Sequence, residues 1–157
     1  MSNTTLTAGD NAPDFSLPRD GGKTVSLSDF AGKTLVLYFY PRDDTSGCTT
    51  EAVDFTGLAD AFAAAGAAVV GVSKDTVDKH EKFIAKHALG LPLLSDAEGD
   101  VCERYGVWAE KSMYGKKFMG IERSTYLIRG DGTIAQVWRK VKVPGHAQQV
   151  LDAVKAL

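Results

Sequence analysis

Two apolar runs of strand length constrain the fold of this chain more than any other feature. "KTLVLYFYP" (33–41) and "AAVVGVS" (67–73) are continuous and rich in β-branched and aromatic residues, a pattern typical of strands buried on both faces of a sheet. Each run is followed by a segment with helical spacing of apolar residues, at 49–65 and at 76–90. Strands that alternate with helices usually pair in parallel, so the sequence predicts an α/β fold.

Two antiparallel hairpins are predicted around this unit, one at residues 13–30 with its turn at Asp20-Gly21-Gly22 and one at 123–140 with its turn at Gly130-Asp131-Gly132. The other expected elements are a short strand, a short helix and a closing helix, at 91–96, 97–107 and 144–157. The predicted architecture is a central mixed β-sheet flanked by helices on both faces, with an N-terminal β-hairpin. No repeat or linker divides the chain, so we expect a single domain over residues 1–157.

Charge and composition exclude several classes of function. The formal net charge is −2 and the basic residues are spread out, which gives no electrostatic basis for binding nucleic acid or an anionic membrane. The densest basic group, "KSMYGKK" (111–117), is predicted to be a solvated loop. Residues 1–15 lack a basic start and an apolar run, and no apolar run approaches the roughly 20 residues of a membrane span. We therefore expect a cytoplasmic protein, and a monomer because no apolar stripe is evident.

The cysteines and histidines do not form a metal-binding pattern. Cys48 and Cys102 are the only cysteines, so there is no disulfide framework and no Cys-x-x-Cys pair for thioredoxin-type disulfide exchange. His80, His87 and His146 are scattered along the chain without ligand spacing. We expect neither a metal nor a cofactor.

Cys48 follows Thr45-Ser46-Gly47 at the polar start of a predicted helix, an unusual position for a structural cysteine. If Thr45 or Ser46 caps this helix, the sulfur lies among free backbone N–H groups at the positive end of the helix dipole. That environment favours the thiolate, which is the reactive form of cysteine. Pro41 ends the preceding strand and is expected to line one side of the pocket. The alternative is a simple capping turn that happens to contain a cysteine.

The residues around this cysteine resemble a known family. Pro41-x3-Thr45-x2-Cys48 matches the active-site signature of peroxiredoxins, and "YFYPRDDTSGCTTEAVDF" (38–55) resembles their bacterioferritin-comigratory, or Q-type, branch. Further similarities occur at "GDNAPDFSL", "PLLSD", "YGVW" and "ERSTYLI", so the resemblance covers nearly the whole chain. It implies a thioredoxin-like fold, in agreement with the predicted order of elements.

The resemblance also implies a reaction. Cys48 would attack hydrogen peroxide or a small organic hydroperoxide and become a sulfenic acid, which gives a role in antioxidant defence. Arg123 would face the sulfur and donate to the peroxide oxygens, together with Thr45 and the backbone N–H of Cys48. Glu51 would position Arg123. From the residues alone, Glu51 also fits a solvated first-turn glutamate and Arg123 an exposed charge at a strand end.

The sequence departs from the usual pattern at the resolving cysteine, which converts the sulfenic acid into a disulfide. Val53 and Ile84 occupy the two positions where Q-type relatives carry it. Cys102 is the only other thiol, and it is either a structural core residue or an unexpected resolver. We therefore expect a one-cysteine mechanism in which thioredoxin or glutathione with glutaredoxin regenerates Cys48. A redox switch without turnover is the alternative that the missing resolver leaves open.

Overall fold

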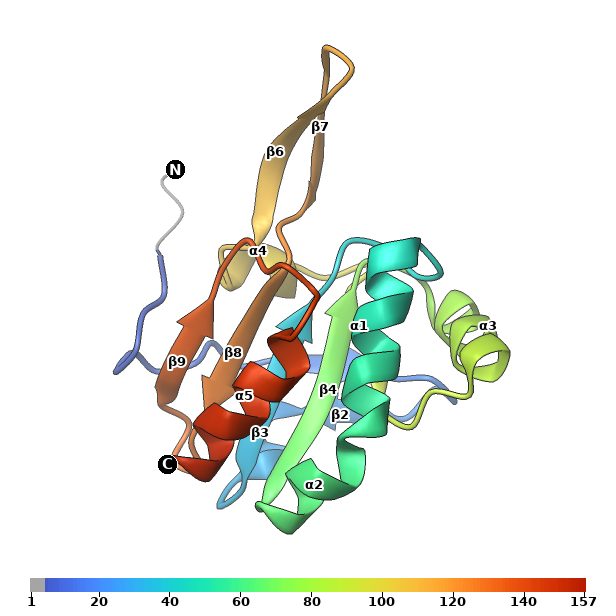
Figure 1. Ribbon diagram of the computed structural model, residues 1–157. Helices are drawn as coiled ribbons and strands as arrows, with labels where there is room; N and C mark the ends of the chain where they lie inside the picture. Colours follow the sequence, from blue (N-terminus) through green and yellow to red (C-terminus); the bar gives the residue numbers. More distant parts are fainter. Residues whose placement is uncertain (1–4) are drawn as a thin grey trace.

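A five-stranded mixed sheet with the order β5-β4-β3-β8-β9 forms the centre of the computed structural model, which describes residues 5–157 (Figure 1). β3 pairs in parallel with β4 and β4 in parallel with β5, while β3–β8 and β8–β9 are antiparallel. This confirms the predicted α/β fold with a mixed sheet. Residues 1–4, where the predicted single domain begins, lie outside the described residues. The strands are β3 (Thr34–Phe39), β4 (Ala67–Ser73), β5 (Leu93–Ser95), β8 (Ser124–Ile128) and β9 (Ile134–Trp138).

Helices cover both faces of the sheet, as predicted, but unequally. One face packs against four helices: α1 (Ser46–Gly57), α2 (Ala59–Ala64), α3 (Val77–His87) and α5 (His146–Lys155). The other face packs against the N-terminal hairpin and two short helices: β1 (Ser16–Pro18), β2 (Thr24–Ser26), the 3-10 helix η1 (Leu27–Phe30) and α4 (Val101–Arg104). Within residues 5–157, no helix is both long and apolar enough to cross a membrane.

The central strand β3 divides the core into two parts because successive side chains of a strand point to opposite faces. Leu35, Leu37 and Phe39 pack on the α4 side, whereas Val36 and Tyr38 pack on the α1 side. All five side chains are almost fully buried. The continuous apolar run thus reflects a strand that is buried on both faces.

Two predicted helices have different ends in the structure. The segment expected at 49–65 begins earlier, at Ser46, and is interrupted at Leu58, where the backbone leaves helical geometry after Gly57. Glycine is a poor helix former, which accounts for the break. The segment expected at 76–90 already ends at His87, because Ala88 adopts a left-handed conformation with φ of 51°.

The prediction of a loop at 111–117 was wrong. These residues belong to a hairpin of β6 (Trp108–Met113) and β7 (Lys116–Ile121) that projects from the body of the protein (Figure 1). Its two-residue turn, Tyr114-Gly115, has positive φ at both positions, which is the geometry of a type I′ turn. The turn therefore allows β6 and β7 to pair as far as Met113 and Lys116, directly on either side of it.

Candidate active site

Cys48 lies in the first turn of α1, directly after the loop that leaves β3. Thr45 is the N-cap residue in an extended conformation, and the Cys48 side chain is only 1% exposed. The expected capping by a side chain is absent, because the Thr45 hydroxyl donates instead to the carbonyl of Arg42 at 2.9 Å. Half-buried Pro41 follows the strand, as expected. The first-turn N–H groups of α1, including that of Cys48, therefore have no side-chain cap from Thr45.

Arg123 connects the sulfur to Glu51. Its Nη2 lies 3.4 Å from Cys48 Sγ, and its Nη1 donates to Glu51 Oε1 at 2.7 Å. Gly47 permits this approach, since a Cβ at that position would lie 3.2 Å from Arg123 Nη2. The structure therefore brings together three of the predicted site residues, although Arg123 is 72 and 75 positions away from the other two.

Burial dominates the electrostatics of Glu51. The side chain is 1% exposed, and this desolvation raises its pKa to about 7, although the nearby Arg123 guanidinium acts in the opposite direction. Burial lowers the pKa of Arg123, but Glu51 and Cys48 more than offset this and raise it. Glu51 is thus no solvated surface residue: it is a buried carboxyl group that holds one side of the guanidinium.

Two residues near this site were missed by sequence reasoning. The pKa of Tyr38 is raised by burial and then by the proximity of Glu51 and Cys48. Its hydroxyl and Glu51 Oε2 are buried and lack a hydrogen-bond partner in the described part of the chain. Lys111 reaches the site from β6, and burial followed by the charge of Arg123 lowers its pKa. No sequence signal distinguishes Tyr38 from its apolar neighbours, and Lys111 was assigned to a loop.

Cys102 is remote from this arrangement. It is fully buried in the core on the α4 side of the sheet, whereas Cys48 belongs to the core on the α1 side. Both cysteines are free. Burial, followed by the proximity of Asp96, raises the pKa of the Cys102 thiol, so it is held in its unreactive neutral form.

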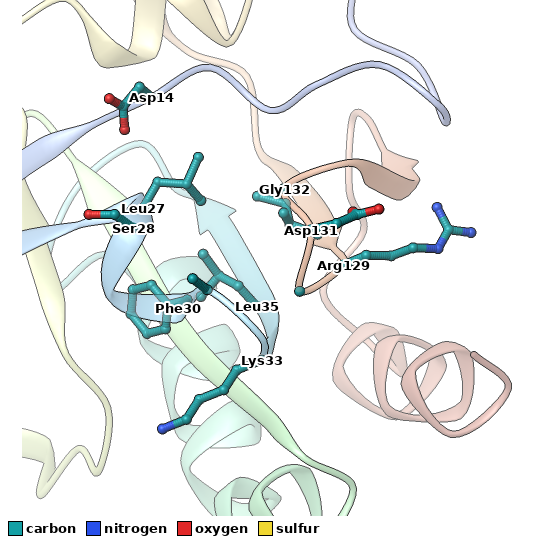
Figure 2. Close-up of a pocket in the computed structure, with 12 residues that line it drawn as sticks. Asp14, Leu27, Ser28, Phe30, Lys33, Leu35, Arg129, Asp131 and Gly132 are labelled. Carbon is teal, nitrogen blue, oxygen red and sulfur yellow. The ribbon is translucent and has the colours of Figure 1, made fainter.

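A cavity lies at the opposite end of β3 from Cys48. It has a volume of about 230 Å³ and lies between η1, the start of β3 and the β8–β9 turn (Figure 2). Leu27, Phe30 and Leu35 form its apolar side, and Asp14, Lys33 and Arg129 lie at its margins. Because none of the residues around Cys48 lines it, this cavity does not serve the thiol. Across residues 5–157, no group of three or more His, Cys, Asp or Glu side chains is arranged to hold a metal ion.

Comparison with known proteins identifies the family. Residues 8–137 match the model of the AhpC/TSA family. The chain belongs to this family. A putative peroxiredoxin Bcp of Coxiella burnetii is 49% identical over 93% of this chain and 97% of its own length. Peroxiredoxin Bcp of Bacillus subtilis is 49% identical over 96% of both chains.

Solved structures agree with this assignment. Peroxiredoxin Q of Xanthomonas campestris superposes with a TM-score of 0.86 at 49% identity, covering 90% of both chains. PrxQ of Xylella fastidiosa gives a TM-score of 0.92 at 41% identity and covers 98% of both chains. The predicted thioredoxin-like fold and the resemblance to Q-type peroxiredoxins are confirmed. The protein is a thiol-dependent peroxidase, an oxidoreductase.

Proposed function

We propose that Cys48 is the peroxidatic nucleophile of this enzyme. Its thiolate attacks the terminal oxygen of a hydroperoxide, so that an S–O bond forms while the O–O bond breaks. The other oxygen takes up one proton, equivalent to the one that the thiol released on ionising, and leaves as water or an alcohol, while the cysteine becomes a sulfenic acid. The observation that supports this assignment best is the pair of contacts of Arg123, with one nitrogen at the sulfur and the other on Glu51.

The other predicted residues have complementary roles in this proposal. Arg123 stabilises the thiolate and donates to the peroxide oxygens as negative charge moves onto the leaving oxygen. Glu51 fixes the guanidinium by accepting from Nη1, which leaves Nη2 directed at the sulfur. Thr45 presents its hydroxyl oxygen to the peroxide as a hydrogen-bond acceptor, and Pro41 lines one side of the site. Small hydroperoxides are suitable substrates because Cys48 is nearly buried.

An external thiol regenerates the enzyme in this proposal. The thiol attacks the sulfenic acid, forming a mixed disulfide and releasing water, and a second thiol then frees Cys48. Val53 and Ile84 cannot supply an internal thiol, and Cys102 lies on the other side of the sheet. The reductant is thioredoxin or glutathione with glutaredoxin. A reducing compartment such as the cytoplasm fits this cycle, and we propose a monomer because the site draws on one chain.

Intact-mass spectrometry tests this mechanism. Reduced protein is treated with one equivalent of hydrogen peroxide, with and without a sulfenic-acid trap, and the product is mapped by peptide digestion. We expect a gain of one oxygen that is trapped at Cys48, unchanged in Cys102→Ser and abolished in Cys48→Ser. A loss of two hydrogens mapped to Cys48 and Cys102 would instead establish Cys102 as the resolver.

A further inference from the structure

The loop before Cys48, residues 41–45, is held by a buried group of polar side chains that the reaction chemistry does not use. Asp43 lies in the middle of this active-site loop, with its side chain 5% exposed. His80 projects from α3 and is completely buried. Its Nδ1 lies 2.7 Å from Asp43 Oδ2, and its Nε2 lies 2.8 Å from the carbonyl oxygen of Leu94 in β5.

The hydrogen-bond partners of His80 indicate which of its ring nitrogens carry a hydrogen. A backbone carbonyl only accepts, so Nε2 must carry a hydrogen. The short contact between Nδ1 and the Asp43 carboxylate also requires one hydrogen between the two atoms. With Asp43 ionised, His80 is an imidazolium, and the buried pair has no net charge. Such a pair is costly to break, because separation leaves a buried charge without a partner.

Asp43 has additional partners on two other elements. The Tyr40 hydroxyl donates to Asp43 Oδ1 at 2.6 Å, and the Asp43 N–H donates to Asp75 Oδ2 at 2.8 Å. Asp75 in turn accepts from the Ser73 hydroxyl at 2.7 Å. The active-site loop is therefore tied to α3, to the end of β3 and to the segment after β4 through one residue.

The neighbouring Asp44 provides a natural contrast. It also reaches α3, where it pairs with Lys86 and His87 at 2.8 Å, but its side chain is 43% exposed. Exposed pairs of this kind contribute little because water and salt screen them. The chain thus offers a buried and an exposed aspartate–histidine pair between the same loop and the same helix.

We propose that Asp43 and His80 are positioning residues of the peroxidase reaction: they fix the active-site loop and thereby hold the first turn of α1, with Cys48, in its reactive position. Neither residue contacts the sulfur or Arg123 in the structure. They act through Asp44, the one residue that separates Asp43 from Thr45, the N-cap of α1. This inference rests on the proposed role of Cys48 as the nucleophile. A displacement of about 1 Å at a reacting group can lower a rate on the order of 10²-fold.

The test compares Asp43→Asn, His80→Gln and their double variant with wild type and with the control His87→Gln, whose partner Asp44 is 43% exposed. The rate constant for sulfenic-acid formation at Cys48 is measured in single-turnover experiments with hydrogen peroxide. We expect each single variant to be slower by on the order of 10²-fold. The double variant should be no slower than either single variant, because residues that act as one unit are not additive. The control should stay within about twofold of wild type.

NMR of the histidine ring nitrogens supplies a second readout. In wild type, both ring nitrogens of His80 should be bonded to hydrogen, whereas in Asp43→Asn only one should be. Asp43→Asn keeps the shape of the side chain, so it remains informative if His80→Gln does not fold.

Wild-type rates in stable single variants, or independent and additive losses in the double variant, would overturn the proposal. Failure of wild-type Cys48 to form a sulfenic acid would overturn the assignment of the nucleophile itself, which is a separate outcome.

Discussion

Replacing Glu51 by glutamine should change how the stability of the protein depends on pH. Burial raises the pKa of Glu51 from 4.5 to about 7. Between these values the folded protein retains a proton that the unfolded chain has already released. The free energy of unfolding therefore falls as the pH rises through this window, and the contribution of Glu51 becomes constant above it.

The magnitude follows from the shift. One pKa unit corresponds to about 1.4 kcal/mol, so a shift from 4.5 to about 7 costs the folded state about 3 kcal/mol at pH values above the window. The side chain is 1% exposed, so solvent screening does not reduce this value substantially. In Glu51→Gln, the titrating group is absent and this loss should not occur.

Urea unfolding of wild type and Glu51→Gln at a series of pH values from below 4.5 to above 7 measures the effect. The difference between the two proteins isolates Glu51, because all other titrating groups are shared. Glu98→Gln, which changes an exposed glutamate, should give a curve parallel to wild type. Parallel curves for wild type and Glu51→Gln would refute the reasoning, and a difference of opposite sign would mean that Arg123 outweighs burial at this carboxyl group.

Two further substitutions test the site and its support. Arg123→Met removes the cation at 3.4 Å from Cys48 Sγ and should slow sulfenic-acid formation about 10²- to 10³-fold, measured in a single turnover; a rate near wild type would exclude the guanidinium from the reaction. Gly71→Ala would place a Cβ 2.8 Å from Tyr38 Cζ and should lower the free energy of unfolding by about 1–3 kcal/mol, whereas Gly57→Ala has open space and serves as its control. Equal unfolding midpoints for the two glycine variants would contradict the steric argument.

The sheet could be predicted from the sequence because its central strands are buried on both faces. The continuous apolar run at 33–41 is typical of a strand that is buried on both faces, and its side chains from Leu35 to Tyr40 are indeed buried. The β6–β7 hairpin lacks this signal, since its tip is exposed on all sides and Met113 and Tyr114 are 58% and 98% exposed. Its turn also places a tyrosine at positive φ, a conformation that sequence patterns associate with glycine, asparagine or aspartate.

The site was predictable only in part. The position of Cys48 at the start of a predicted helix marked it as a candidate nucleophile. Its distance in sequence from Arg123 gives no indication that the two residues meet, and only the resemblance to a family predicted that contact. The partnership of Asp43 with His80 was missed because the two residues are 37 positions apart and meet only when α3 packs beside the loop. Likewise, the Thr45 hydroxyl fits a capping role by its position, yet it turns back to the Arg42 carbonyl.

Two features of the structure favour regeneration of Cys48 by an external thiol. One is the separation of the two thiols, and the other is the set of contacts that hold the active-site loop. An internal disulfide would require Cys102 to leave one core of the protein and Cys48 to leave the other, across the intervening sheet. If Asp43 holds the first turn of α1 as proposed, such a movement would also break its buried contacts with Tyr40 and His80. An external thiol does not require Cys102 to leave its core. If Asp43 and His80 position Cys48 as proposed, the same contacts favour regeneration by an external thiol, and we predict that α1 remains folded throughout the cycle.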